Sequence, residues 1–178
     1  QHPASARWLH DRLRNIPMPD RDATWSVVTF DVLDDSDTLQ RVFDWAESDP
    51  AIADDATEVV ALLLTWLLTS SNRPLRDHVT KVLVEVLRTG LDTATFLLER
   101  FADVDDDYVR ERLLTAVYGA VMRGGDSDHS GVRAVAEEII RWHDTGRLPI
   151  NVLARDSARG TIAWARARGL ANPDALTA

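Results

Sequence analysis

The sequence predicts an all-α fold built from a helical repeat, and three observations lead to that prediction. Apolar residues recur at helical spacing in almost every segment of the 178-residue chain. The alternation of apolar and polar residues that is typical of strands is absent, and only residues 26–30 lean towards β-structure. A short motif of an apolar residue, an arginine and an acid recurs near the start of three predicted helices.

About nine helices are expected, and proline, glycine and capping residues mark their ends. The first helix begins near Trp8 and ends before Pro17, because proline removes a backbone donor. The second begins near Asp20 or Asp22, and the third begins at Ser36, since these side chains cap helices well. The helices that follow are longer and more apolar.

The fourth predicted helix covers residues 54–69 and is the most apolar segment of the chain. Its centre, residues 59–68, is apolar on every side, so we expect this helix to be the most buried element, with Leu63 and Leu67 in the core. Five further helices follow, over about residues 73–89, 92–101, 107–123, 130–143 and 152–168.

The recurring motif places Arg76, Arg110 and Arg155 near the starts of three of these helices. The acids that follow them are Asp77, Glu111 and Asp156. The arginines are 34 and 45 residues apart, which brackets the length of a two-helix repeat, and one helix pair has too little core to fold alone. We therefore expect antiparallel helix pairs, with the arginines at equivalent positions, pairing with nearby acids as a structural ladder. A binding role for this row is the alternative.

Composition and charge narrow the classes of function. The net charge of −9 argues against attraction to nucleic acid or to anionic membranes. The absence of cysteine excludes disulfides and thiolate metal sites and suits a cytoplasmic protein. No segment is typical of a signal peptide or of a membrane span. Because residue 1 is glutamine, we expect residues 1–178 to be a single domain from a longer protein.

No pattern of catalytic or metal-binding residues is present, so we expect no catalytic residue, no metal and no cofactor. The five histidines show no zinc-ligand spacing, and no nucleophile motif occurs. Residues 103–107 and 126–129 are expected to begin helices rather than to bind a metal. Residues 132–168 hold seven arginines and four acids, in an otherwise acidic chain. The candidate partner-binding residues in this segment are Arg159, Trp164, Arg166 and Arg168.

Four segments, in this order, resemble the large bacterial STAND NTPases, which are ATPases of the NACHT and apoptotic type that often serve in antiviral defence. The segments are residues 18–25, 71–83, 108–119 and 150–160. Residues 103–117 are also similar to the second-helix signature of HEAT repeats, in which an acidic turn leads into Val-Arg and spaced small and apolar residues. The resemblance implies a HEAT-like α-solenoid from the C-terminal sensor region. The chain has no Gly-x-x-x-x-Gly-Lys-[Ser/Thr] phosphate loop, so no ATP-binding residue is carried over.

The resemblance implies a non-catalytic module that binds a protein partner or holds the parent NTPase in an autoinhibited state. The expected partners are a protein or other domains of the same chain, with no nucleic acid and no membrane. One alternative is a HEAT-like nucleic-acid-binding protein or DNA glycosylase that uses Trp, Asp and Arg on a concave face, and the net charge argues against it. Another is an intramolecular scaffold that binds no ligand.

Overall fold

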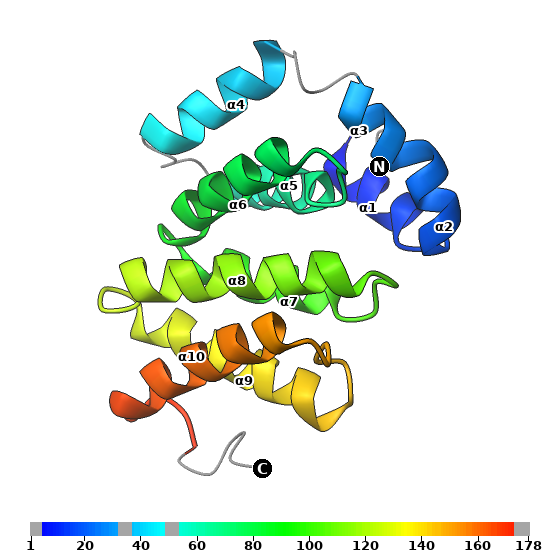
Figure 1. The fold of residues 1–178 in the computed structure, drawn as a ribbon. Coiled ribbons are helices and arrows are strands. Elements are labelled where there is room, and N and C mark those ends of the chain that lie inside the picture. Colours follow the sequence, from blue (N-terminus) through cyan, green and yellow to red (C-terminus); the bar gives the residue numbers. More distant parts are fainter. Residues whose placement is uncertain (1–4, 32–36, 49–53, 173–178) are drawn as a thin grey trace.

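The computed structural model describes residues 5–31, 37–48 and 54–172. These residues form nine continuous helical segments and no strand, which confirms the predicted all-α class (Figure 1). The elements are α1 (Ala6–Leu13), a run of α2 (Met18–Arg21), the π-helical turn η1 (Asp22–Ser26) and α3 (Val27–Asp31), then α4 (Asp37–Ser48), α5 (Asp54–Leu67), α6 (Arg73–Leu87), α7 (Leu91–Phe101), α8 (Asp107–Gly124), α9 (His129–Asp144) and α10 (Val152–Ala167). The predicted start of the third helix, Ser36, lies outside the described residues.

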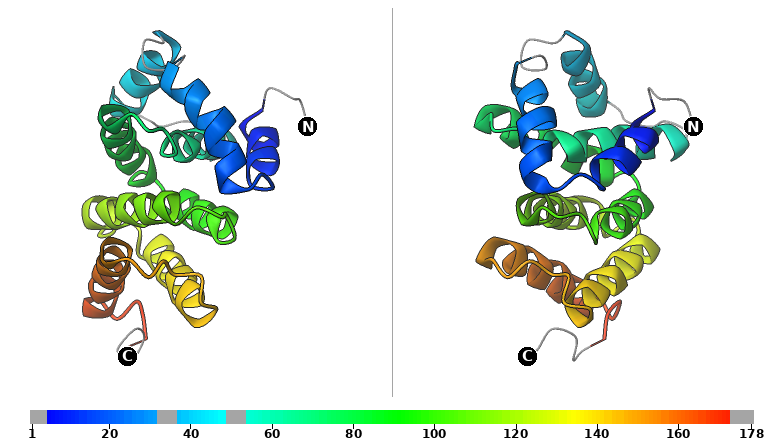
Figure 2. Two further views of the ribbon diagram at one scale, coloured as in Figure 1. Left: turned by 45° about the vertical axis from the view of Figure 1, so that its right-hand side comes forward. Right: turned by 90° about the vertical axis from the view of Figure 1, so that its right-hand side faces the viewer.

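The last six helices form two parallel rows. In the first row, α5 packs on α7 and α7 packs on α9, and in the second row α6 packs on α8 and α8 packs on α10. The chain reverses direction at each loop, so the two helices of each pair run antiparallel (Figure 1). Figure 2 shows the two rows side by side, with α1 packed against α5 at the N-terminal end. No helix among the described residues has both the length and the apolar character that a membrane span needs.

The three helices of the second row begin with the same kind of cap. Asn72, Asp106 and Asn151 each accept a hydrogen bond from the backbone N–H three residues further on. The donor–acceptor distances are 3.2, 3.1 and 2.9 Å. The arginine of the repeated motif is then the fourth residue of each helix. The cap therefore sets the register in which all three arginines hold equivalent positions.

In the first row, a single carboxylate caps two helices. Asp128 accepts the N–H of Gly131 in α9 at 2.9 Å, and its other oxygen accepts the N–H of Leu91, the first residue of α7, at 3.1 Å. Burial opposes ionisation of Asp128, but these two N–H groups, together with the Ser130 hydroxyl and the charge of His129, more than offset it and lower the pKa of the carboxyl group. A Cβ atom at position 131 would lie 2.6 Å from Leu91 Cβ, so glycine is required for the close approach of the two helices.

The core runs continuously from α5 to α10, and α5 is its most apolar member. Trp66 and Leu67 are completely buried. Leu63 was predicted to lie in the core, but it is only partly buried and lines a shallow hollow beside Trp8 of α1. The helix is apolar on every side, but the short α1 covers its outer face incompletely.

We predict different costs for two leucine-to-alanine substitutions in α5. Leu67→Ala should lower the free energy of unfolding by about 2–5 kcal/mol, because it leaves a cavity in a closed core. Leu63→Ala should cost clearly less, because the side chain already borders solvent. Urea unfolding of both variants tests this, and equal losses would show that the outer face of α5 is as tightly packed as the inner face.

Candidate binding groove

Arg76 and Arg110 tie second-row helices to neighbouring loops. Arg76 donates to the carbonyl oxygen of Ser70 at 2.6 Å, and its guanidinium lies 5.2 Å from the ring centre of Tyr108 on α8. Arg110 donates to Ala102 O at 3.3 Å and to Arg147 O at 2.8 Å. Each arginine therefore contacts the loop before its own helix and an element of the following repeat.

The acids of the repeated motif do not pair with the arginine that precedes them in the sequence. Asp77 pairs with Arg112 of α8 at 3.3 Å and with Arg73 at 3.6 Å. Arg110 pairs with Asp107, which precedes it in the first turn. In the described part of the chain, Glu111 and Asp156 form no ion pair. Arg155 is exposed and has no ion pair among those residues either, since no further helix pair follows α10 there.

Arg21 holds the same position in its own helix as the arginines of the second row hold in theirs. It is the fourth residue of α2 and is completely buried. It donates to Ile16 O at 3.2 Å and to Asp105 O at 2.8 Å, and it pairs with Asp106 at 3.1 Å. The Arg21-Asp22 dipeptide was the available signal, but the partners lie 84 and 85 residues away.

A buried polar cluster surrounds this pair and extends to α1. His10 is 1 % exposed and packs against Phe101. Its Nδ1 accepts a hydrogen bond from Trp66 Nε1 at 3.2 Å. Burial, followed by the charges of nearby arginines, lowers the pKa of His10 to about 4. Burial raises the pKa of the Asp106 carboxyl group, although the hydrogen bond from the Val109 N–H and the charge of Arg21 act to lower it. Because these side chains are shielded from solvent, they cannot reach a substrate, and we interpret the cluster as structural.

Three of the four candidate partner-binding residues in the C-terminal segment are engaged within the chain. Trp164 is 8 % exposed and packs closely on Gly125. The Arg168 guanidinium stacks 3.5 Å from the Trp164 ring centre and pairs with Asp126 at 2.9 Å. Arg166 donates to Asn172 O at 3.1 Å. Arg159 is exposed on α10 and forms no ion pair within residues 5–31, 37–48 and 54–172.

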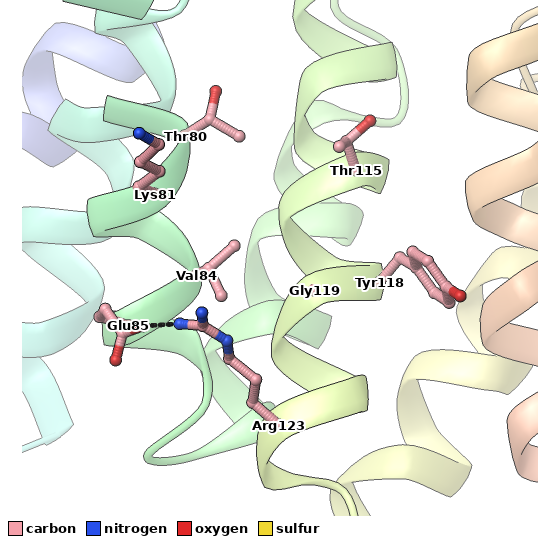
Figure 3. A pocket seen from close by; sticks show the side chains of 8 residues that line it. All are labelled: Thr80, Lys81, Val84, Glu85, Thr115, Tyr118, Gly119 and Arg123. Carbon is pink, nitrogen blue, oxygen red and sulfur yellow. Dashed lines mark hydrogen bonds and ion pairs between the residues drawn. The ribbon is translucent and has the colours of Figure 1, made fainter. Parts of the chain in front are cut away.

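An open groove of about 590 Å³ lies between α6 and α8, and we call it the α6–α8 groove (Figure 3). Its lining residues are Thr80, Lys81, Val84 and Glu85 of α6 and Thr115, Tyr118, Gly119 and Arg123 of α8. None of the residues selected from the sequence lines it. The sequence signal that could have indicated it is the glycine inside α8, since a helix-interior glycine often marks a close approach.

Two glycines set the shape of this groove. A Cβ atom at Gly119 would lie 2.9 Å from Val84 Cγ2, so glycine lets α6 and α8 approach closely at the groove floor. A Cβ atom at Gly160 of α10 would lie 2.7 Å from the ring of Tyr118. The Tyr118 ring points towards α10 and away from the groove centre (Figure 3). The centre of the groove is therefore left open above Val84 and Gly119.

The polar groups at the groove are mostly committed to partners within the chain. Thr80 and Thr115 donate their hydroxyl protons to backbone carbonyls one turn earlier, at 2.7 and 3.0 Å. Glu85 pairs with Arg88 at 2.5 Å and with Arg123, which crosses from α8 at one end of the groove (Figure 3). Lys81 is exposed and has no ion pair with a described residue. The groove thus offers an apolar floor and one uncommitted ammonium group.

Nothing in the groove suggests catalysis or metal binding. The described residues that line it include no histidine, and the one carboxylate among them is paired with two arginines. No group of three or more metal-ligating side chains lies together in the described part of the chain. What the arrangement can do is bind an apolar ridge that carries a negative charge beside it.

No protein-family model matches the chain, and no curated protein and no solved structure matches it significantly. The similarity to STAND NTPases therefore stays a prediction.

We predict that equivalent arginines contribute unequally to stability. Arg110→Ala should lower the free energy of unfolding by about 1–3 kcal/mol, because it leaves the part-buried carbonyl oxygens of Ala102 and Arg147 without this donor. Arg155→Ala is the matched control, and its cost should stay within about 0.5 kcal/mol because the side chain is exposed. Denaturant unfolding measures both, and equal effects would remove the loop-tying role assigned to Arg110.

We also predict that His10 makes folding sensitive to mild acid. The unfolded histidine takes up a proton below its ordinary pKa of 6.5, whereas the folded one resists until about pH 4. Stability should therefore be fully present above pH 6.5 and should fall by up to about 3 kcal/mol towards pH 4. Asp106 acts in the opposite direction, because its raised pKa favours proton uptake by the folded state.

The comparison with His10→Asn isolates the histidine, since the amide oxygen can still accept from Trp66 and does not titrate. Unfolding free energies at pH 7, 6, 5 and 4 should show the difference between the two proteins changing below about pH 6.5. Parallel pH profiles would contradict the assignment.

Proposed function

We propose that this chain is a non-catalytic interaction module that binds an α-helical segment of a protein partner in the α6–α8 groove. The observation that carries the proposal is the open groove itself, which lies between the parallel helices α6 and α8 of the second row and is floored by Val84 and Gly119. Grooves between helices accept the apolar face of an amphipathic helix, which places side chains at one-turn intervals along the groove.

A HEAT-like α-solenoid is the architecture we propose for the two rows. Its support is the repeated packing of successive helix pairs and the recurrence of the same cap and arginine in the second row. Arrays of this kind present extended surfaces along one row of helices, and partners bind along them. The groove lies on such a row.

The wider setting we propose is the sensor region of a STAND-type NTPase, supported by the four ordered sequence segments. The partner segment would then come from a recognised protein or from another domain of the parent chain. The alternative of a DNA glycosylase receives less support, because the net charge of −9 opposes a polyanion. Trp66, Trp142 and Trp164 are buried, although Trp8 is 40 % exposed.

Peptides selected from a displayed library of helical sequences test the groove. We expect peptides that bind the chain to lose at least about tenfold in affinity on Thr115→Trp, which fills the groove. Glu99→Trp, an exposed position on α7 of the other row, should leave binding unchanged. Fluorescence anisotropy gives the affinities, and circular dichroism confirms that both variants fold.

Hydrogen exchange of the unmodified chain provides a measurement that needs no substitution. The selected peptides should slow exchange in α6 and α8. Protection confined to other helices, or full binding by the Thr115→Trp variant, would contradict the proposed site.

A further inference from the structure

The sign of the charge follows the two rows of helices. The second row, α6, α8 and α10, carries nine basic and five acidic residues within its helices. The first row, α5, α7 and α9, carries three basic and eight acidic residues. The sequence alone suggested a division between the two ends of the chain, but the helical packing separates the charges by row. A chain with a net charge of −9 thus presents one cationic row.

The surplus of positive charge is present at the α6–α8 groove. Lys81 and Arg123 come from its two walls, and Glu85 is the only acid among the described residues that line it. Glu85 is already shared by Arg88 and Arg123, so the local balance remains positive. The aliphatic stem of a lysine can lie along apolar surface while the ammonium group stays in water. Lys81 is therefore able to flank an apolar ligand and to contact a carboxylate at the same time.

We propose that the segment that occupies the α6–α8 groove is an acidic amphipathic helix of a protein partner. Its aliphatic side chains lie over Val84 and Gly119, and its carboxylates face Lys81 and Arg123. The proposal rests on the proposed function of the groove and adds the charge and shape of the ligand. Electrostatic complementarity of this kind favours the correct partner and repels basic ones.

Nucleic acid fits these observations less well. Binding to a nucleic acid rests on contacts between several cationic side chains and the phosphates. The groove supplies Lys81 and a partly neutralised Arg123. The acids of the first row and the net charge of −9 would repel a polyanion as a whole. A short acidic helix with an apolar face needs few cations, because burial of its aliphatic side chains supplies much of the binding free energy.

Two synthetic peptides of equal length test the inference. Both are amphipathic helices with a leucine face, and the polar face is glutamate in one and lysine in the other. Both peptides carry a fluorescein label. The Leu/Glu peptide should bind the full chain with an affinity that falls as salt is added. The Leu/Lys peptide should bind at least about tenfold more weakly.

Lys81→Glu should lower the affinity for the Leu/Glu peptide by about tenfold, because the change removes an attraction and adds a repulsion. Arg133→Glu is the matched control, since it makes the same charge change at an exposed position on α9 of the acidic row. It should have little effect. Equal losses from the two variants would attribute binding to net charge and would overturn the proposal.

The remaining outcomes separate this inference from the proposed function. If both peptides bind equally and Thr115→Trp blocks both, the acidic preference is wrong and the groove function stands. If the Leu/Glu peptide binds and Thr115→Trp leaves it unaffected, the groove itself is not the site, and both proposals fail. If single-stranded DNA binds more tightly than the Leu/Glu peptide and loses affinity in Lys81→Glu, the groove is a nucleic-acid site and the inference is overturned.

Discussion

The buried ion pair between Arg21 and Asp106 is the constraint on which the arrangement of helices depends. Asp106 caps α8, so its position is fixed by the start of that helix. Arg21 holds a carbonyl in its own loop and contacts both Asp105 and Asp106. A buried charge that lacks its partner costs several kcal/mol, so the α2 run and the loop before α8 must stay together once the chain has folded.

The same device recurs with neutral acceptors further along the stack. Arg110 binds the carbonyl of Arg147 and so fixes the loop before α10, and Arg76 reaches the first turn of α8. At the opposite end of the helices, Asp128 joins the starts of α7 and α9. With both ends held, the distance between α6 and α8 is set by the glycine at position 119. The α6–α8 groove is a consequence of this spacing, and its charge follows from which row of helices forms its walls.

Much of the fold could be predicted from local sequence signals. Caps, prolines and helical periodicity are properties of neighbouring residues, and they located the helices and the equivalent positions of Arg76, Arg110 and Arg155. The π-helical turn over Asp22–Ser26 has no pattern of its own in the sequence, and it was missed. The burial of Arg21 was also missed, because its partners are remote in sequence.

The candidate site was harder to predict, for a physical reason. Thr80, Thr115 and Gly119 are ordinary helix residues, and they form a groove only because α6 and α8 lie beside each other. Trp164 and Arg168 stack on each other, and an arginine beside a tryptophan is as typical of such an internal stack as of a binding surface. The packing of successive helices within a row, which no local pattern specifies, decides which of these residues can meet a partner.

A double-mutant cycle on Arg21 and Asp106 measures how strongly the two side chains stabilise each other in the folded protein. Asp106→Asn keeps an oxygen for the Val109 cap and removes the charge, and Arg21→Met keeps most of the side-chain volume. Unfolding free energies of the wild type, the two single variants and the double variant give the coupling energy. We predict a coupling energy of at least about 1 kcal/mol, with the double variant destabilised by less than the sum of the two single variants. A coupling near zero would contradict it.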